Sequence, residues 1–563
     1  MFRTARRIPS LLLALILSLA ALPLAGCRSD SDSAGADPAV ETVADGEGAG
    51  EELPADPEPA ETAADENAPA AFADSTALFQ ARTARTKAAP GDIGVRLTYR
   101  GVELPTADGR YFLPISDAFE PEDLLGLAAL AEPEGEPRLL IDSHIFVSGI
   151  SAFLAHNTPL EIMVCTEDAF AQADLIFTTL PVLSADLARD RISGREKDCA
   201  FSLWEARGKD LRRTDSPAAL KVRGASSASL AKTPLKLELR DGNGEGRNLP
   251  LLGMRKDDDW ILCASYSDYA HVRDAVGLAL WGKMAEALDL KPAGALETRF
   301  VELILGGSYD GFYLMMEKFD AKTLGLDAEK GDALFKCISW DVPDSAGLRR
   351  QPPRSPAYSS MEKKFPDPED RTDGNWETLA DYVALSYEAD GSGFAEGIEE
   401  KADRRNMLAY WLFLNLTMAA DNTWKNTYYA EIGGKICAFP WDLDISFGLG
   451  WNGDPANNYL YEQAGMAERT YDFQTGRRML KYIKGCADEV KEMYEILKDR
   501  GIAGADNIIA DAEKYWDELH SSGAWARNKT RWPSGNNVDS LDYFRETVKT
   551  REAWFEDYLA SLD

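Results

Sequence analysis

Short apolar runs separated by polar turns dominate residues 76–200. The runs at 95–99, 139–141, 160–164 and 175–179 have the length and the apolar or alternating character of strands. They predict a β-rich module, for which a sandwich-like arrangement is one candidate. No motif in this module indicates chemistry, so we expect it to serve packing or partner binding.

Beyond residue 200 the pattern changes to strands mixed with helices. A strand is expected at 235–239, after a run of small residues and a proline. The apolar runs at 300–305 and 311–316 are separated by a Gly-Gly turn, which predicts a hairpin.

Apolar residues recur at helical spacing in three later segments. They predict helices over 271–290 and 402–420, and one or two helices over 482–517. Residues 341–373 are rich in Pro, Asp and Arg, and we expect a long surface loop there. Together with the strands, these helices predict the α+β class.

The first 27 residues are expected to be a targeting segment. Three arginines precede an apolar run over 11–22, which is shorter than the roughly 20 residues of a membrane span. The Leu-Ala-Gly sequence before Cys27 resembles the bacterial lipobox, in which the cysteine carries lipid. This predicts a lipoprotein of the bacterial cell envelope, held at the membrane on its extracytoplasmic side by a lipid anchor. The alternative is an ordinary secretory signal with an incidental cysteine.

Residues 28–75 are expected to be a disordered acidic tether. They contain 14 Asp or Glu against a single Arg, and Phe72 is their only aromatic residue. Such a segment cannot bury enough apolar surface to fold, and its like charges keep it extended.

Composition and charge limit the classes of function. The chain of 563 residues has 61 Lys and Arg against 94 Asp and Glu, a net charge of −33, and 45% of its residues are hydrophobic. The hydrophobic content is enough for a folded core over most of the chain. The acidic balance argues against a nucleic-acid partner, because binding phosphates requires a basic face. Anionic ligands such as nucleotides would need a local basic pocket or a metal ion.

Seven cysteines are present. Without Cys27, which is expected to carry the lipid, six remain, and they are widely scattered. No C-x-x-C pair occurs, so neither a zinc site nor a dense disulfide framework is expected. One or two long-range disulfides remain an alternative to buried free thiols.

The residues that carry chemistry flank a short predicted hairpin. Asp421 and Asn426 follow the 402–420 helix, while Asp442 and Asp444 follow the second strand of the hairpin. The hairpin therefore predicts that the two acidic loops lie near each other. An Asp followed five residues later by an Asn is the spacing of protein-kinase catalytic loops, where the Asp accepts the proton of the attacking hydroxyl and the Asn ligates a metal. Carboxylate and amide oxygens are also ligands that Mg²⁺ prefers.

Each of these motifs alone has a structural interpretation. An Asp in a turn usually caps the turn, and alternating Asp residues at a strand end usually face solvent. The order helix, D-x-x-x-x-N, hairpin and W-D-x-D is more specific than any one of its parts.

In this order the motifs resemble the CotH (spore coat protein H) family of atypical kinases over about residues 200–535. The resemblance implies an atypical protein-kinase-like domain at 201–555 that uses ATP and Mg²⁺ (or Mn²⁺). It also implies transfer of phosphate to Ser or Thr of an exported or cell-surface protein. The matching stretches are Arg223 to Ser227, Lys232 to Leu239, Leu251 to Gly253, Trp260 to Leu262, Ser265 to Asp268, Val301 to Leu305, Gly311 to Lys318, Asp421 to Tyr428 and Trp441 to Gly448.

The resemblance also implies roles for individual residues. Asp421 would be the catalytic carboxylate. Lys236 would contact the α- and β-phosphates, with Lys232 as a reserve candidate, and Glu317 would lie where a hinge meets adenine. A turn of small residues would approach the phosphates through backbone N–H groups. The turn residues are Arg223, Gly224, Ser226 and Ser227, and the metal ligands are Asn426, Asp442 and Asp444.

Several positions depart from the kinase pattern. Two alanines precede the catalytic Asp in place of His-Arg, and the second metal motif reads D-L-D-I-S-F-G instead of D-F-G. Ala225 stands where relatives commonly carry Asn. The choice between Asp442 and Asp444 as the main metal ligand stays open. Asp268 and Arg273 match family positions, but their chemistry alone assigns them no role.

Three other functions compete with a kinase. Ser229 and Lys232 form an S-x-x-K pair, as in penicillin-recognising enzymes, but no K-T-G or S-D-N accompanies it, and Pro234 disfavours the required helix. Four histidines occur without a G-x-S-x-G motif, so a Ser-His-Asp triad is poorly supported. The third alternative is a catalytically silent kinase-like scaffold or binding lipoprotein, in which Asp421→Asn would leave function intact.

Overall fold

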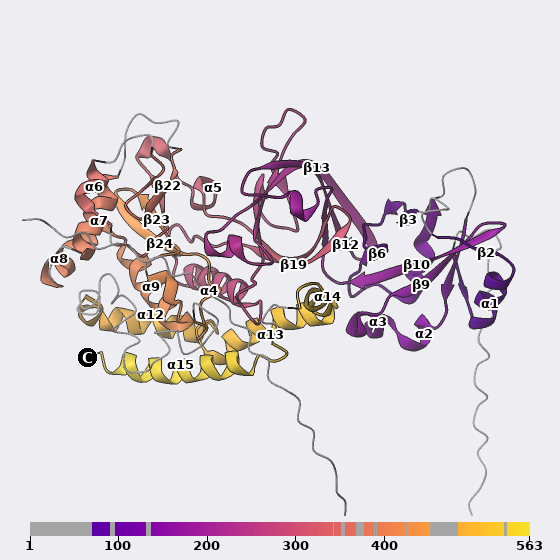
Figure 1. The fold of residues 1–563 in the computed structure, drawn as a ribbon. Coiled ribbons are helices and arrows are strands. Elements are labelled where there is room, and N and C mark those ends of the chain that lie inside the picture. Colours follow the sequence, from indigo (N-terminus) through magenta and orange to yellow (C-terminus); the bar gives the residue numbers. More distant parts are fainter. Residues whose placement is uncertain are drawn as a thin grey trace, which may run out of the picture. The chain divides into compact units, whose positions relative to one another are not determined.

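The computed structural model describes most of the chain beyond residue 69 (Figure 1). The described residues contain both helices and strands, which confirms the α+β class. Cys27 and residues 28–69 of the expected tether lie outside the described part. No helix in the described ranges combines the length and the apolar character needed to cross a membrane. The described ranges are 70–89, 96–130, 137–341, 343–350, 355–367, 376–387, 389, 391–423, 425–450, 482–533 and 538–562.

Two sheets form the N-terminal part of the described chain. Their strands are β1 Ala70–Ala73, β2 Thr86–Lys87, β3 Arg96–Tyr99, β4 Val102–Glu103, β5 Thr106–Ala107, β6 Arg110–Pro114, β7 Leu127–Leu130, β8 Arg138–Asp142, β9 Leu160–Cys165 and β10 Ala169–Thr178. The larger sheet has the order β1-β8-β9-β10-β6-β5, with β2 paired to β10, and the smaller has the order β4-β3-β7. Leu97 and Leu127 of the smaller sheet share one hydrophobic cluster with Leu139 and Ile162 of the larger sheet. The expected β-rich region is therefore confirmed, and its two sheets enclose a common core.

Strand β1 shows that the expected extent of the tether is wrong for its last residues. Ala70 pairs with Leu139 of β8 in a parallel ladder, and helix α1 (Ser75–Thr83) follows, capped by Asp74. The uncharged Ala-rich strand is held by pairing with β8, a partner that local composition does not reveal. Two further short helices, α2 (Ile145–Ser148) and α3 (Ile150–His156), belong to the same module.

A closed barrel follows the N-terminal module. Its strands are β11 Val182–Ala185, β12 Lys197–Arg207, β13 Asp210–Val222, β14 Leu235–Leu239, β17 Asp259–Cys263, β18 Thr298–Leu305 and β19 Ser308–Met316. They close in the order β11-β12-β13-β14-β17-β19-β18, so the expected domain boundary at residue 201 falls inside a barrel strand. On β14 the leucines belong to the barrel core, while Lys236 and Glu238 alternate with them. A small two-stranded sheet, β15 (Leu249–Pro250) with β16 (Lys256–Asp257), lies between β14 and β17 in sequence.

A separate five-stranded sheet carries the hairpin predicted from the sequence. Its strands are β20 Ala333–Cys337, β21 Ala357–Tyr358, β22 Met361–Phe365, β23 Thr427–Ile432 and β24 Lys435–Pro440, in the order β21-β22-β20-β23-β24. The expected irregular loop over 341–373 is wrong where the structure describes it, because α6 (Ser345–Arg349), β21 and β22 lie within it. Strand β22 is stabilised by its ladder with β20, a long-range pairing that the Pro- and Arg-rich composition conceals.

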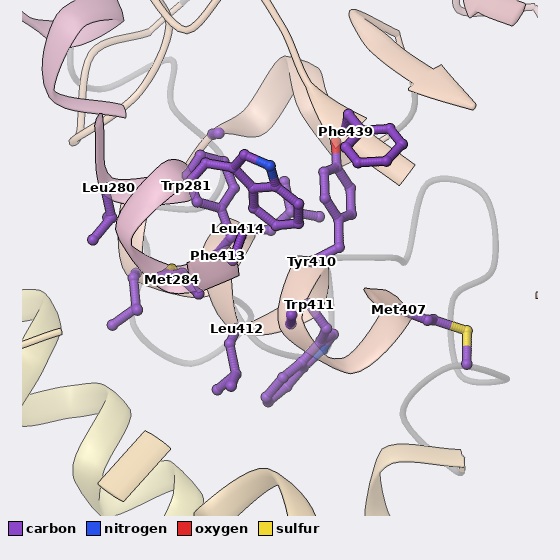
Figure 2. Packing of buried hydrophobic residues seen from close by; sticks show 14 of the residues in the cluster. Leu280, Trp281, Met284, Met407, Tyr410, Trp411, Leu412, Phe413, Leu414 and Phe439 are labelled. Carbon is purple, nitrogen blue, oxygen red and sulfur yellow. The ribbon is translucent and has the colours of Figure 1, made fainter. Parts of the chain in front are cut away.

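Helices α4 (Arg273–Ala287) and α9 (Arg404–Thr417) pack together in the largest hydrophobic cluster (Figure 2). The Trp281 ring centroid lies 5.9 Å from that of Tyr410, 5.5 Å from that of Phe413 and 6.2 Å from that of Phe439. These edge-on contacts join α4, α9 and β24. The helix expected at 402–420 ends earlier, at Thr417, and its C-cap residue Met418 has a positive φ of 51°.

In the described C-terminal part, three helices pack on this core and a fourth, α14, packs on barrel strand β19. They are α12 Ala487–Asp499, α13 Ala505–Ser521, α14 Ala524–Arg531 and α15 Asp542–Ala560. Helix α15 packs on α9 and α13, and α13 packs on α4. The helices expected over 271–290 and 482–517 are thus confirmed. Further helices in the described part of the chain are α5 Ala321–Leu324, α7 Glu377–Tyr387 and α8 Gly391–Lys401.

The six cysteines in the described chain are all free. Cys165, Cys337, Cys437 and Cys486 are buried, and burial raises the pKa of each of these four thiols. They therefore stay protonated near neutral pH. The sequence left open either one or two long-range disulfides or buried free thiols, and in the described chain the cysteines are free thiols.

Candidate active site

The β23–β24 hairpin brings the two acidic loops to the same end of one sheet. Thr427, at the start of β23, lies opposite Pro440, at the end of β24. The loop that contains Asp421 and Asn426 runs directly into Thr427, and the segment that contains Asp442 and Asp444 directly follows Pro440. The proximity predicted from the hairpin is therefore confirmed.

Asn422 ties the two loops together. Its side-chain Nδ2 donates to the carbonyl of Asn426 at 3.1 Å and to the carbonyl of Trp441 at 2.8 Å. The hydroxyl of Tyr410, on α9, donates to the carbonyl of Asn422 at 2.9 Å. Because Asn422 is fully buried, these bonds form away from water and fix the loops relative to each other.

Both loops contain a residue in the left-handed backbone region. The φ of Asn426 is 61° and that of Asp442 is 62°. Asn and Asp tolerate this region better than other side chains because their short polar groups bond locally. Backbone of this kind is held in place only by its surroundings, and it concentrates at functional sites.

The start of helix α4 anchors the second acidic segment. Asp274 accepts a hydrogen bond from the backbone N–H of Leu443 at 2.7 Å. The guanidinium of Arg273 donates to the carbonyl of Ser446 at 3.0 Å and forms a buried ion pair with Asp268. Asp268 and Arg273, to which their chemistry alone assigned no role, therefore position the segment that carries Asp442 and Asp444.

The three predicted carboxylates of the site are partly buried and lack partners. In the described part of the chain, Asp421, Asp442 and Asp444 make no ion pair within 4.0 Å and no hydrogen bond through their side chains. The pKa of Asp421 is raised to about 6, mainly by burial. The charge of Lys425 opposes this shift, and the charge of Asp442 adds to it. Burial, followed by the charge of Asp442, raises the pKa of Asp444 well above its usual range.

Asp274 belongs to the same electrostatic group. Burial and then the charge of Asp442 raise its pKa to about 7. Asp442 thus acts on Asp274, Asp421 and Asp444 alike, which places it at the centre of the group. The carboxylates repel one another, and a cation between them would relieve that repulsion.

The donor set fits a magnesium ion that arrives with phosphates. Among the described residues, no three His, Cys, Asp or Glu side chains are spaced to form a closed metal cage. Mg²⁺ does not require such a cage, because it is usually held by one or two carboxylates together with waters and substrate phosphates. Asp442, Asp444 and the amide of Asn426 supply oxygens of this kind.

The small-residue turn after β13 reaches the same place. Gly224 has a φ of 99°, and a side chain there would meet the hydroxyl of Ser227. A 3₁₀ turn follows from Ser226 to Ser229, and Gly224 and Ser226 are exposed. The guanidinium carbon of Arg223 lies 5.5 Å from the ring centroid of Trp441. The structure thus brings the predicted phosphate turn beside the residue that precedes Asp442.

The structure does not bring Lys236 to these carboxylates. Its ammonium lies 2.7 Å from Glu238, 2.8 Å from Asp259 and 3.9 Å from Glu196. The pKa of Lys236 is raised overall. Burial alone would lower it, but the bonds to Asp259 and Glu238 outweigh the effect of burial. Lys236 is therefore neutralised by neighbours on the barrel, and its predicted contact with phosphates has no support from this geometry.

Lys232 and Glu317 also have structural roles. The ammonium of Lys232 is fully buried and donates to the carbonyl of Phe312 and to Asn528. The two carboxylate oxygens of Glu317 accept from the backbone N–H groups of Arg255 and Glu297, each at 3.0 Å. The side chain of Glu317 thus holds two chain segments together, and its predicted place beside adenine would have to rest on backbone groups.

Sequence reasoning missed Lys336, which lies beside the site. It sits in the middle strand β20, opposite Tyr428 of β23. Burial lowers its pKa to about 8, while the nearby charge of Asp442 opposes this shift. A single charged residue inside the apolar run Leu334 to Cys337 was the signal that could have found it.

A surface cavity of about 360 Å³ lies elsewhere, between the N-terminal module and the barrel. Ile115, Arg207, Arg299 and Glu518 are among the residues that line it, and none of the candidate site residues does. The carboxylates discussed above therefore belong to a different part of the surface.

Comparison with known proteins agrees with the motifs and their order. Residues 220–555 match a family model described as CotH kinase protein, which covers more than half of the chain. A search of the curated proteins finds no match. The chain belongs to the CotH kinase protein family.

Proposed function

We propose that this chain transfers the γ-phosphate of ATP, with a divalent metal, to Ser or Thr of an exported or cell-surface protein. One observation carries the proposal: three partly buried carboxylates without partners in the described chain converge at one end of the β23–β24 hairpin. Membership of the CotH kinase family supports a kinase-like activity in general. The nature of the acceptor and the dependence on a metal are part of the proposal.

Asp421 is the catalytic carboxylate in this proposal. It accepts the proton of the acceptor hydroxyl while the hydroxyl oxygen attacks the γ-phosphorus. The bond between the γ-phosphorus and the bridging oxygen breaks, so ADP leaves with the electron pair. Asp442 and Asp444, with the amide of Asn426, would hold Mg²⁺ or Mn²⁺, which when bound neutralises the phosphate oxygens.

The barrel and the helix-covered five-stranded sheet would be the two lobes of an atypical kinase-like fold. Helix α9, the 421–426 loop, the hairpin and the second acidic segment follow one another in the order of a kinase catalytic region. The Arg223 turn joins the barrel to this region through Trp441. Both features support the proposal for the fold.

We also propose that Cys27 carries a lipid that holds the protein at the extracytoplasmic side of the bacterial membrane. Cys27→Ser would then shift the protein from the membrane fraction to the soluble fraction or leave an uncleaved precursor. Fractionation followed by immunoblotting measures this, with wild type as reference. An unchanged membrane fraction for the mature variant would contradict the anchor.

The activity is tested by incubating the intact chain with γ-labelled ATP, Mg²⁺ or Mn²⁺, and dephosphorylated casein as a general Ser/Thr acceptor. Wild type is expected to label the acceptor or itself. Asp421→Asn and Asp444→Asn are expected to lose at least about 100-fold in rate, the typical contribution of a positioned base. Asp198→Asn, at a carboxylate that is 86% exposed on the barrel, should keep the wild-type rate.

Equal labelling by wild type and both site variants would contradict the kinase assignment. Absence of labelling in every sample, with ATP bound, would favour the scaffold alternative. Circular dichroism of each variant establishes that lost labelling does not reflect an unfolded chain.

A further inference from the structure

Two basic side chains from two different sheets approach the same aromatic ring. Arg223 follows barrel strand β13, and its guanidinium carbon lies 5.5 Å from the ring centroid of Trp441. Lys336 belongs to β20 of the five-stranded sheet, and its ammonium lies 5.7 Å from that centroid and 5.5 Å from the ring of Tyr428. Trp441 immediately precedes Asp442.

Neither of these cations is neutralised by a nearby carboxylate. Across the described residues, no Asp or Glu oxygen lies within 4.0 Å of either charged group. The acidic neighbour of Lys336 on strand β22 is Glu362, which is paired with Lys364 at 2.7 Å. In a chain with 94 acidic and 61 basic residues, two adjacent cations without carboxylate partners are conspicuous.

The charge of Arg223 also disfavours the charged form of Lys336. Burial lowers the pKa of Lys336 to about 8, Asp442 opposes this, and the charge of Arg223 lowers it further. Contact with the Trp441 ring gives back only part of the lost hydration, because a cation–π contact is a modest interaction. An anion that touches both groups would stabilise both.

The Trp441 ring is a fixed part of this arrangement. It is 2% exposed and packs against the rings of Phe319 at 6.1 Å and Tyr428 at 5.7 Å. The ring therefore cannot turn away, and it keeps Arg223 and Lys336 at the edge of the Asp442 loop. Two partly buried cations beside unpartnered carboxylates are complementary to a polyphosphate that carries a metal ion.

We propose that Arg223 and Lys336 form a two-cation clamp for the polyphosphate of the bound nucleotide. Lys336 takes the role that the family resemblance implies for Lys236. This inference rests on the proposed function only for the identity of the nucleotide. The guanidinium offers a planar pair of donors to phosphate oxygens, and the ammonium acts as a compact charge. Because the cations come from two sheets, a bound polyphosphate links the barrel to the five-stranded sheet.

The test compares ligand binding by the intact chain and its variants, measured by calorimetry with Mg²⁺. The probes are ATP, inorganic tripolyphosphate and adenosine. Lys336→Gln and Arg223→Gln are each expected to weaken ATP and tripolyphosphate about ten-fold or more, the effect of losing a charge-assisted contact. Adenosine affinity should not change, and Lys336→Arg, which restores the charge, should recover most of the loss.

Lys236→Gln is the matched control, because it removes a lysine that is already neutralised. It is expected to bind ATP within about two-fold of wild type. Wild-type ATP affinity in Lys336→Gln, or a larger loss in Lys236→Gln, would overturn the clamp. Failure of the wild-type chain to bind either ATP or tripolyphosphate would overturn it as well.

These experiments can distinguish failure of the clamp proposal from failure of the kinase proposal. A chain that binds ATP through Arg223 and Lys336 but labels no protein would support the clamp and contradict phosphate transfer. A chain that labels protein with equal nucleotide affinity in wild type and Lys336→Gln would support the kinase and contradict the clamp.

Discussion

Asp442 is the residue on which the electrostatics of the site depend. Its charge raises the pKa of Asp421, Asp274 and Asp444, after burial in each case. The sequence left Asp442 and Asp444 equivalent as metal ligands. The structure separates them by their influence: the charge of Asp442 raises the pKa of Asp421, Asp274 and Asp444, whereas Asp444 is itself one of the carboxylates on which Asp442 acts.

The repulsion among these carboxylates predicts that Asp444→Asn stabilises the metal-free protein. The pKa of Asp444 is higher in the folded chain than in the unfolded chain. At a pH above the pKa of the unfolded chain, Asp444 therefore loses its proton more readily in the unfolded chain than in the folded chain. Asp444 therefore makes wild type lose stability as the pH rises, and the variant lacks this contribution. We expect a gain of about 0.5–2 kcal/mol in unfolding free energy at neutral pH, measured by urea denaturation with EDTA.

That gain should shrink toward acid pH, where Asp444 is protonated in both states of wild type. A variant less stable than wild type at neutral pH would contradict the description of Asp444 as an unpartnered buried charge.

Lys232 provides an independent test away from the site. Burial lowers its pKa to about 7, with Asp310 opposing. Between about pH 7 and pH 10 the unfolded chain holds a proton that the folded chain lacks, so raising the pH stabilises wild type. Relative to Lys232→Met, the unfolding free energy of wild type should rise by up to about 1.4 kcal/mol per pH unit.

Urea denaturation of both proteins across this range measures the difference, in which titrating groups that do not interact with Lys232 cancel. Parallel pH profiles for wild type and Lys232→Met would show that Lys232 stays charged in the fold. Below about pH 7 the two profiles are expected to run parallel, because both states then hold the proton.

Among the structural elements, the β23–β24 hairpin and helix α9 set the geometry of the site. The hairpin fixes both loops at one end, and Tyr410 of α9 holds the backbone of Asn422. Helix α15 in turn holds the end of α9, where Arg551 donates to the carbonyl of Asn415. A cation at a helix C-terminus is favourable because the last carbonyls lack helical partners.

The bridge made by Asn422 predicts a loss of both stability and activity in Asn422→Ala. The variant leaves the carbonyls of Asn426 and Trp441 without this donor, which costs about 1–3 kcal/mol of unfolding free energy. Asn406→Ala is the matched control, since Asn406 is also buried and bonds twice to Ala438 of β24. At a similar loss of stability, phosphate transfer should fall much further in Asn422→Ala. Equal activity in the two variants would mean that the bridge does not position the loops.

Local patterns predicted the elements best where they did not depend on distant partners. Apolar spacing predicted the strands at 235–239, 300–305 and 311–316 and the helices at 271–290 and 402–420. The structure has all five, with both helices shorter than predicted. Strand β1 and strand β22 were not predicted, because their pairing with β8 and β20 stabilises segments whose composition favours a tether or a loop. Their existence depends on contacts that a local window does not contain.

At the scale of the whole molecule, the sequence predicted which carboxylates converge but not which cations accompany them. Asp421, Asn426, Asp442 and Asp444 lie on a contiguous helix–loop–hairpin unit, so their proximity follows from local connectivity. Lys336 is far from that unit in sequence and joins it only through the order of the five-stranded sheet. Lys236 was chosen by analogy, and the barrel instead surrounds it with carboxylates.

The roles of Asp268 and Arg273 are non-local as well. Arg273 reaches Ser446 across a sequence separation of 173 residues, and no motif records that contact. The barrel, the start of helix α4 and the five-stranded sheet thus supply the site with parts that become visible only when the chain is folded.

The account depends on one claim: the two acidic loops form a single site for a metal ion bound with nucleotide. The most direct measurement is electron paramagnetic resonance of Mn²⁺ with a non-hydrolysable ATP analogue. Wild type should bind Mn²⁺ tightly only when the analogue is present, and Asp442→Asn and Asp444→Asn should each weaken it about ten-fold or more, with Asp198→Asn unchanged. Mn²⁺ and nucleotide affinities that are the same in wild type and both site variants would contradict the claim.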